Sequence, residues 1–248
     1  MTLLEHGRPS KDATNQAYAW FSAVTTADWN TMRSLHDGGL PIDVSHPLRQ
    51  TTALMEATRQ RRAKVVEWLL HHGASPVLLA GTRATTALHI ALKMEHLQIA
   101  DRLLLASPSA ASCDYAGHTT LHLLCANIMT EPRQISLATK IAEIILMKGC
   151  HIDALDNEGI SALHYCVING LYALAKLLLN HGANPNIMSP ESKVTPLTIA
   201  ALERQRDMVE LLIHYGANPN ICTQDGKSPL ELMPEIQQWV AQPASQMN

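Results

Sequence analysis

The sequence has few aromatic and few charged residues. Among its 248 residues there is one phenylalanine, aromatic side chains make up 4% of the chain and charged side chains 17%. The net charge is −3 and the pI is near 6.5, so the chain lacks the overall basic excess that draws proteins to nucleic acids or anionic membranes. We therefore expect no nucleic-acid partner.

Long apolar runs and export signals are also missing. No segment approaches the roughly 20 apolar residues that cross a bilayer, and the first residues, MTLLEHGRPSKD, turn polar too early for a signal peptide. The sequence contains no Asn-x-Ser/Thr glycosylation site. Its five scattered cysteines form no CxxC pair and are not typical of a disulfide framework. These absences predict a cytoplasmic protein in a reducing compartment, without a membrane partner.

The common catalytic and metal-binding motifs are absent. The sequence has no G-x-S-x-G, no glycine-rich phosphate loop and no H-E-x-x-H. His122 with Cys125 and His164 with Cys166 are close pairs, but no second Cys/His pair completes the four ligands of a zinc site. A buried free cysteine mostly behaves as a small hydrophobic residue. We expect no metal, no cofactor and no enzymatic activity.

What the sequence does contain is a repeated unit, seen most completely in residues 156–186, DNEGISALHYCVINGLYALAKLLLNHGANPN. It begins with a turn signal, continues with two apolar segments of helical character and ends in a second turn. Gly170 and Gly182 stand where each helix ends and where a residue that tolerates positive φ is needed. This pattern predicts the order turn, helix, turn, helix, turn.

The unit recurs with a nearly constant period. A leucine that follows a Thr-x or Ser-x pair recurs at intervals of 34, 33, 42, 34 and 33 residues, at Leu54, Leu88, Leu121, Leu163, Leu197 and Leu230. A period of about 33 residues marks a solenoid of stacked units. The hydroxyl before each leucine is a suitable helix cap, and the third interval holds nine extra residues.

The downstream halves of the units also agree. VVEWLLHHGA, ALAKLLLNHGA and MVELLIHYGA superimpose, and each is followed by Ser-Pro or Asn-Pro-Asn. These residues resemble the ankyrin repeat, with its pattern G-x-T-P-L-H-x-A and a second helix that ends L-L-L-x-x-G-A-D/N-x-N. The resemblance implies an all-α solenoid of paired antiparallel helices with protruding β-hairpin-like fingers, in about six to seven units including caps.

The predicted ankyrin-repeat domain spans residues 14–240, between a disordered lead-in at 1–13 and a tail at 241–248. Its expected units are 14–45, 46–80, 81–113, 114–155, 156–188, 189–222 and 223–240. The third unit lacks the closing glycine near Ser107, so we expect an irregular exit turn. The fourth holds the insertion, placed at 128–136, and Pro132 favours a longer loop or a first helix that is extended and then broken.

Two repeated polar positions are interpreted as structural. His89, His122 and His164 occupy one slot of successive units, where the resemblance implies imidazole hydrogen bonds that tie neighbouring loops together. Asn186 and Asn220 match the asparagine that closes the ankyrin turn, and their expected role is turn geometry.

Charge does not follow the repeat. Residues 46–105 contain eight Lys or Arg and four acidic residues, which makes this part +4 and leaves −7 for the rest of the chain. A basic surface here fits an acidic protein segment or a phosphate, although an accidental excess on a solvated face explains the count equally well. In the ankyrin pattern the candidate partner-binding residues lie on the concave helix face and the fingers: Arg49, Arg59, Gln60, Arg62, Arg83, Lys93, Met94, Tyr115, His118, Asn127, Glu158, Ile168 and Asn169.

The resemblance therefore implies a non-enzymatic, monomeric module that binds a partner protein through its concave groove and finger tips. Two settings compete: a cytosolic adaptor or inhibitor, and an effector that an intracellular bacterium delivers into the host cytosol. Stand-alone arrays with weak repeats favour the effector. The alternative function is an enzyme with a Cys/His site near the insertion, which requires an exposed Cys125 beside His122.

Overall fold

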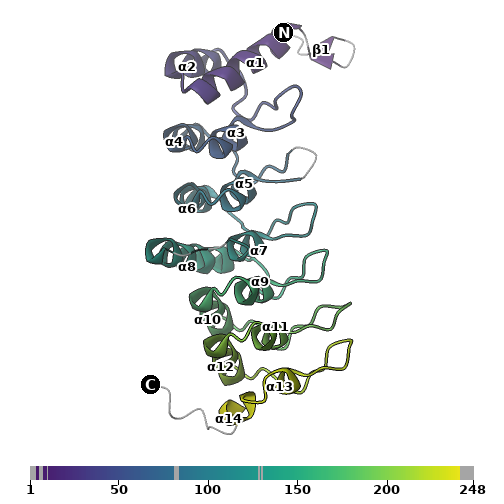
Figure 1. Cartoon of the computed structure of the whole chain (residues 1–248). Coiled ribbons are helices and arrows are strands. Elements are labelled where there is room, and N and C mark those ends of the chain that lie inside the picture. Colours follow the sequence, from purple (N-terminus) through teal and green to yellow (C-terminus); the bar gives the residue numbers. More distant parts are fainter. Residues whose placement is uncertain are drawn as a thin grey trace. The chain divides into compact units, whose positions relative to one another are not determined.

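The computed structural model describes residues 4–5, 8–9, 11–80, 84–127, 129 and 131–240. The chain divides into two compact units, and unit 1 ends at Tyr115 while unit 2 begins at Ala116. Each unit consists of pairs of helices joined by loops, and within each unit the loops project to one side of the helices (Figure 1). The predicted all-α solenoid of helix pairs is confirmed.

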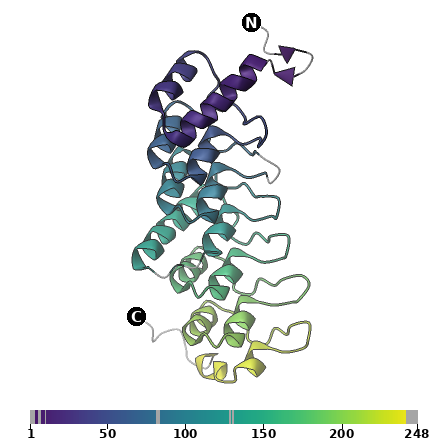
Figure 2. The ribbon, with the colours of Figure 1, turned by 45° about the horizontal axis from the view of Figure 1, so that its top comes forward.

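Unit 1 begins with a short pair of strands and continues with three helix pairs, which follow one another along the chain in Figures 1 and 2. The strands β1 and β2 pair antiparallel, with Leu4 opposite Pro9. The elements of unit 1 are β1 (Leu4–Glu5), β2 (Arg8–Pro9), α1 (Lys11–Thr26), α2 (Trp29–Asp37), α3 (Ala53–Arg59), α4 (Ala63–His71), α5 (Ala87–Lys93) and α6 (Leu97–Ala106).

Unit 2 contains four helix pairs, of which the last is short. Its elements are α7 (Thr120–Cys125), α8 (Pro132–Met147), α9 (Ala162–Ile168), α10 (Tyr172–Asn180), α11 (Pro196–Leu202), α12 (Arg206–His214), α13 (Pro229–Leu232) and α14 (Ile236–Val240). Pro234 separates α13 from α14, as expected for a terminal cap.

Six of the first helices begin in the same way. A Thr or Ser in extended conformation accepts a hydrogen bond from the backbone N–H three residues later, which satisfies one of the free N–H groups at the helix start. These caps are Thr52, Thr86, Thr119, Ser161, Thr195 and Ser228. The predicted capping role of the hydroxyl before each repeat leucine is confirmed.

The core of each unit lies between its first and second helices. The first helices α3, α5, α7, α9 and α11 are buried over nearly their whole length; in α3, for example, residues from Ala53 to Thr58 are all buried. Second helices bury one stripe, such as Val65, Val66 and Leu69 in α4. Because one face of each second helix stays in solvent, these helices are amphipathic while the first helices are not.

The exit turn of the third repeat is irregular, as expected. After α4 the chain leaves through Gly73, whose φ is +86°. After α6 the corresponding turn has no glycine, and the helix is followed by Ser107 in extended conformation, with φ −85° and ψ 134°. The Ser107 hydroxyl donates to the Ser109 carbonyl at 2.6 Å and so supports this different turn.

The insertion at 128–136 lengthens both the second helix and the loop before it, so the expected longer loop is confirmed in part and the extended first helix is wrong. Six residues separate α7 from α8, whereas three separate α3 from α4. α7 has six residues, whereas α8 has 16 residues in place of the nine of α4 and α10. Pro132 is the first residue of α8. A proline is tolerated there because the N–H it lacks would have no partner within the helix. Ile128 and Thr130 lie outside the described residues.

The lead-in prediction is also wrong in part. α1 begins at Lys11, inside the segment 1–13 that was expected to be disordered, and β1 pairs with β2 ahead of it. The buried stripe of α1 starts at Ala17, and Asp12 in the first turn suits the positive end of the helix dipole. The tail at 241–248 lies outside the described residues. Within the described part of the chain, no helix combines the length and the apolar character that crossing a membrane requires.

Candidate protein-binding surface

The first helices α3 and α5 of unit 1 expose only their last residue. In α3 and α5 every residue before the last is buried, and Arg59 and Lys93, which end these helices, are exposed. The next residues, Gln60 and Met94, cap the helices and are exposed as well. We call Arg59, Gln60, Lys93 and Met94 the unit 1 row. The structure thus exposes four of the predicted binding residues on neighbouring first helices.

A buried carboxylate orders part of this row. Glu56 is only 5% exposed, yet its carboxylate oxygens lie 2.7 Å from Gln60 Nε2, 3.4 Å from Arg49 Nη1 and 3.9 Å from Arg59 Nε. A buried charge is tolerated only with such partners. Arg49 on the finger and Arg59 on the helix are therefore held toward one carboxylate, and both side chains remain at least half exposed.

Glu56 was not among the predicted site residues. Its position in the repeat is occupied by uncharged residues in the other capped first helices, so a carboxylate stands where the repeat otherwise has Ile90, Leu123, Tyr165, Ile199 and Leu232. Aligning the repeats position by position would have shown this exception. The informative feature in the sequence is a single residue that departs from the repeat pattern, and not a motif.

The other predicted residues of unit 1 are dispersed. Arg62 is exposed in the turn before α4, and Tyr115, 60% exposed, ends the unit. Arg83, predicted on a finger, lies outside the described residues.

Unit 2 exposes the same positions with a different chemistry. Ile168 ends α9 and is 49% exposed, and Leu202 ends α11 and is 56% exposed. Asn169 and Glu203 follow as the capping residues. We call Ile168, Asn169, Leu202 and Glu203 the unit 2 row. Its centre is aliphatic, whereas that of the unit 1 row is cationic.

Several predicted residues of unit 2 have structural contacts. Asn169 Nδ2 donates to the Cys125 carbonyl at 3.0 Å, so this side chain ties α9 to α7. His118 is partly buried, with Nε2 3.6 Å from Asp156 Oδ2. Glu158 is exposed and Asn127 is half-buried. Asn169 and His118 are therefore constrained by the fold, while Glu158 remains available on its loop.

Asp156 organises the loop that carries Glu158. One of its oxygens accepts the backbone N–H groups of Glu158 and Ile160 at 2.9 Å each, and the other accepts the Tyr165 hydroxyl at 3.0 Å. The turn signal at Asp156 was recognised in the sequence, but this carboxylate was not predicted as the centre of a network. A side-chain acceptor at the start of a turn is a common role for aspartate.

The histidine slot has the role implied by the resemblance. In His89, His122 and His164, Nδ1 accepts the backbone N–H of the helix cap at 3.0–3.2 Å. Nε2–H then donates to a carbonyl of the following loop, on Ser112, Ile160 and Val194 respectively. Burial lowers the pKa of His122 and of His164, which keeps these rings neutral and preserves this pattern.

The geometry required by the enzyme alternative is not present. Cys125 is fully buried on α7, and both ring nitrogens of His122 are engaged in the cap and the next loop. Cys166 lies against Cys125, and burial raises the pKa of the Cys166 thiol, which makes a thiolate nucleophile harder to form. Among the described residues there is also no group of three or more His, Cys, Asp or Glu side chains placed to hold a metal ion.

The turn asparagine connects successive fingers. Asn186 Nδ2 donates to the Gly216 carbonyl at 3.0 Å, and Asn186 Oδ1 accepts the Asn218 N–H at 2.7 Å. In unit 1, Asp43 accepts the Ser75 N–H in the same way. The side chain at this position therefore links one repeat to the next as well as shaping its own turn.

Comparisons with known proteins agree with this architecture. The family model for three copies of the ankyrin repeat matches residues 133–223, and the model for a single ankyrin repeat matches residues 49–80. Human ankyrin repeat and SOCS box protein 16 is 31% identical over 50% of this chain and 25% of its own length. The mouse B-cell lymphoma 3 protein homolog is 32% identical over 60% of this chain and 32% of its own length.

Among solved structures, the ankyrin repeat domain of Bcl-3 superimposes with a TM-score of 0.73 at 24% identity, over 90% of this chain and 98% of that domain. This likeness concerns the fold. The chain spans a third or less of the length of the two curated relatives named above.

Proposed function

Because this chain belongs to the ankyrin-repeat family, whose repeats bind protein partners, we propose that it binds a partner protein through the ends of its first helices and the adjoining fingers. One observation carries this proposal. Helices that are otherwise buried expose their last residues side by side, as Arg59 and Lys93 in unit 1 and as Ile168 and Leu202 in unit 2. An exposed side chain at these positions contributes little to the hydrophobic core. Folding therefore places little constraint on the residue type there, which can suit a binding partner instead.

The two rows fit different parts of a partner. The unit 1 row, with Arg49 held beside it, presents guanidinium and ammonium groups that suit an acidic segment. The unit 2 row presents Ile168 and Leu202, which suit an apolar patch bordered by polar groups. The proposed partner therefore carries carboxylates where it meets unit 1 and apolar side chains where it meets unit 2.

Affinity capture with row variants tests this proposal. The chain is immobilised in four forms, namely unchanged, with Arg59→Glu and Lys93→Glu, with Ile168→Asp and Leu202→Asp, and with the control Lys140→Glu and Glu143→Lys on α8. Proteins captured from cytosol are identified by mass spectrometry. The expected result is a set of proteins that the unchanged chain and the control retain and that each row variant loses.

All four forms must be folded at the temperature of the experiment, which thermal unfolding checks; the unit 1 form should have the lowest midpoint, because Arg59→Glu removes a cation beside the buried Glu56 carboxylate. If both row variants retain the same proteins as the unchanged chain, the binding surface lies elsewhere and the proposal is wrong. If only one row variant retains the captured proteins, the interaction is assigned to the row that the other variant changes.

We also propose that the chain acts as a monomer in the cytoplasm, without catalysing a reaction. It serves either as an adaptor or inhibitor in the cell that makes it or as an effector in the cytosol of a host cell. The monomer is tested by analytical ultracentrifugation, where a concentration-dependent increase in mass contradicts it. The effector role is tested by following an epitope-tagged chain during infection, where its confinement to the producing cell contradicts delivery.

A further inference from the structure

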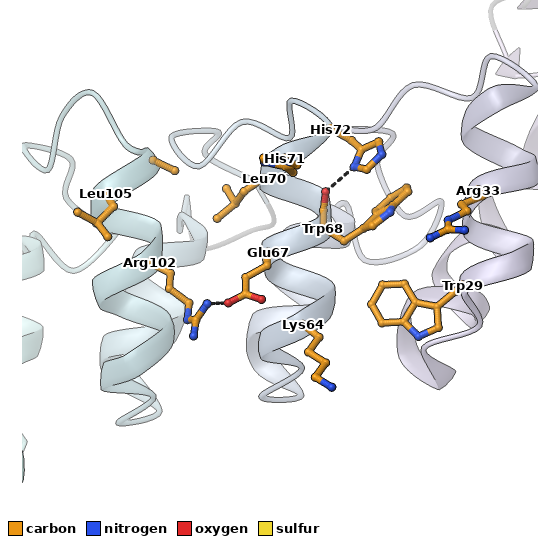
Figure 3. Close-up of a pocket in the computed structure, with 11 residues that line it drawn as sticks. Trp29, Arg33, Lys64, Glu67, Trp68, Leu70, His71, His72, Arg102 and Leu105 are labelled. Carbon is orange, nitrogen blue, oxygen red and sulfur yellow. Dashed lines mark hydrogen bonds and ion pairs between the residues drawn. The ribbon is translucent and has the colours of Figure 1, made fainter.

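Unit 1 contains an open groove on the side of its second helices, away from the unit 1 row. The groove has a volume of about 920 Å³ and is lined by residues from α2, α4 and α6 (Figure 3). No residue of the first helices α3 or α5 lines it. It is therefore a second surface, distinct from the one proposed above.

An ordered group of rings forms part of the groove wall. The indole of Trp68 stacks on the His72 ring with a centroid distance of 3.8 Å and an interplanar angle of 23°. His72 Nδ1–H donates to the Trp68 carbonyl at 2.7 Å, and His36 and Trp20 lie against Trp68 from inside the unit. Because Trp68 is already fixed, binding against it costs little conformational entropy.

Apolar surface continues on either side of Trp68. Leu105 on α6 is 71% exposed, although the two leucines before it, Leu103 and Leu104, are buried. Trp29 on α2 lines the groove at its opposite end (Figure 3). A single exposed leucine is unremarkable, but here Leu105, Trp68 and Trp29 line one groove. Such a surface suits apolar side chains of a partner.

The charges around the groove are predominantly positive. Three basic side chains line it, Arg33, Lys64 and Arg102, against one carboxylate, Glu67. Glu67 is paired with Arg102. Within the part of the chain that the structure describes, Arg33 and Lys64 form no ion pair. The groove thus carries two uncompensated cations beside its apolar wall.

This basic character is not a general property of the second helices. In unit 2 a smaller groove between α10 and α12 is lined by Tyr172, Lys176, Asp207 and Glu210 among others. There the carboxylates outnumber the single lysine. The repeat pattern alone therefore does not explain the positive charge of the unit 1 groove.

We propose that the unit 1 groove binds an acidic peptide segment of a partner protein that carries an apolar anchor residue. The anchor packs between Trp68 and Leu105, and carboxylates of the segment pair with Arg33 and Lys64. A peptide fits better than a small anion because the groove is open, extends over three helices and is largely apolar. Paired carboxylates set the orientation and the association rate, while the apolar contact supplies most of the affinity.

The test begins with a selection of short random peptides displayed on phage against the full chain. Selected sequences are expected to combine Asp or Glu with Leu, Phe or Trp. A synthetic selected peptide carrying a fluorophore then gives dissociation constants by fluorescence anisotropy. Arg33→Glu with Lys64→Glu should weaken binding by at least about tenfold, and Leu105→Ala by about threefold. Adding salt should weaken binding to the unchanged chain.

Matched controls separate this groove from the surface proposed above. Arg59→Glu with Lys93→Glu changes the unit 1 row, and Lys176→Glu changes the unit 2 groove, and both should leave peptide affinity unchanged. Failure of the affinity-capture experiment therefore does not affect this one. The milder pair Arg33→Gln and Lys64→Gln, checked by circular dichroism, guards against a loss of fold as the cause of lost binding.

Three results would overturn the proposal. The selection yields no acidic apolar peptides, or the groove variants bind the selected peptide as tightly as the unchanged chain does. The third is sedimentation that shows self-association, abolished both by Lys64→Glu and by Asp207→Lys with Glu210→Lys. That outcome would assign the groove to a second copy of this chain.

Discussion

Units 1 and 2 have first helices that are built alike and end differently. In each, a capped and buried helix exposes its last residue, which is Arg59 or Lys93 in unit 1 and Ile168 or Leu202 in unit 2. Stacking requires the buried positions to be conserved in type, because each repeat buries its faces only against neighbours. The last residue escapes that requirement. Differences between the units in the last residue of the first helices therefore concern binding more than folding.

The units also differ in how their helix starts are tied to the next loop. In unit 2, α7 and α9 both place a histidine in the third helical position, whereas in unit 1 only α5 does, and α3 has Met55 there. Each histidine joins the cap of its own helix to a carbonyl of the following loop. Unit 2 thus has two imidazole links between a helix cap and the following loop, where unit 1 has one.

The largest expected effect follows from removing one of these rings. His164→Ala leaves a cavity and deprives the Ser161 N–H of its acceptor, so it should lower the free energy of unfolding of unit 2 by about 2–3 kcal/mol. Hydrogen exchange read by mass spectrometry resolves the two units separately. His89→Ala is the matched variant and should weaken protection in unit 1. Equal loss of protection in both units from either variant would show that the units do not unfold separately.

Acid should weaken unit 2 through the same residues. Burial places the pKa of His122 and of His164 below the ordinary value of 6.5. The unfolded chain then binds more protons than the folded chain below that value, so stability is complete above about pH 6.5 and falls as the pH decreases. Urea unfolding at a series of pH values measures this. His122→Gln with His164→Gln should flatten the dependence, and an unchanged slope would exclude these histidines as its cause.

The solenoid, its period and its caps were predictable because they depend on local and repeated signals. A Thr or Ser before each repeat leucine and a glycine after most of the second helices act within a few residues, and most of the units repeat both signals. The lengthening of the second helix by the insertion was missed for a related reason. Pro132 was interpreted as a break, although a proline is equally suited to begin a helix, and α8 begins at it.

The candidate site was less predictable because it depends on side chains that meet in space. Helix periodicity places Arg59 and Lys93 at exposed ends, but it does not reveal that Glu56 draws Arg49 toward Arg59. Nor does it reveal that Asn169 is used to bind the Cys125 carbonyl. The groove beside Trp68 was missed entirely, since it is formed by residues of three helices that are far apart in the sequence.

A smaller difference lies in the turn that joins α9 to α10, where Gly170 stands at the position that Arg61, Glu95 and Arg204 occupy in other repeats. Gly170 has φ +64°, and a Cβ there would touch nothing within 4 Å, so Gly170→Ala should cost only the backbone strain of about 1 kcal/mol. In unit 1 the matching residue Glu95 already has φ +58°. Glu95→Gly should therefore change stability by less than about 1 kcal/mol, toward stabilisation. Thermal unfolding of both variants measures these changes in stability. Stabilisation by Gly170→Ala or destabilisation by Glu95→Gly would contradict the strain argument.

The smallest effect on stability is expected from exchanging the exposed rows, and this exchange tests their role most directly. Arg59→Ile with Lys93→Leu gives unit 1 an aliphatic row, and Ile168→Arg with Leu202→Lys gives unit 2 a cationic one. Each exchange should alter the free energy of unfolding by no more than about 0.5 kcal/mol, because these side chains are exposed. The unit 1 exchange should cost slightly more, since it removes Arg59 from the buried Glu56 carboxylate and leaves only Arg49 and Gln60 beside it.

Binding should respond to the exchange much more than stability does. A captured partner that meets the unit 1 row through carboxylates binds less tightly as salt is added, and the unit 1 exchange should remove most of this salt dependence. Titrations by isothermal calorimetry at low and high salt compare the unchanged chain with both exchanges. The affinity of both exchange variants could depend on salt as strongly as that of the unchanged chain. In that case the charges at the ends of the first helices do not select the partner. The difference between the two units would then be a property of their surfaces without a function in recognition.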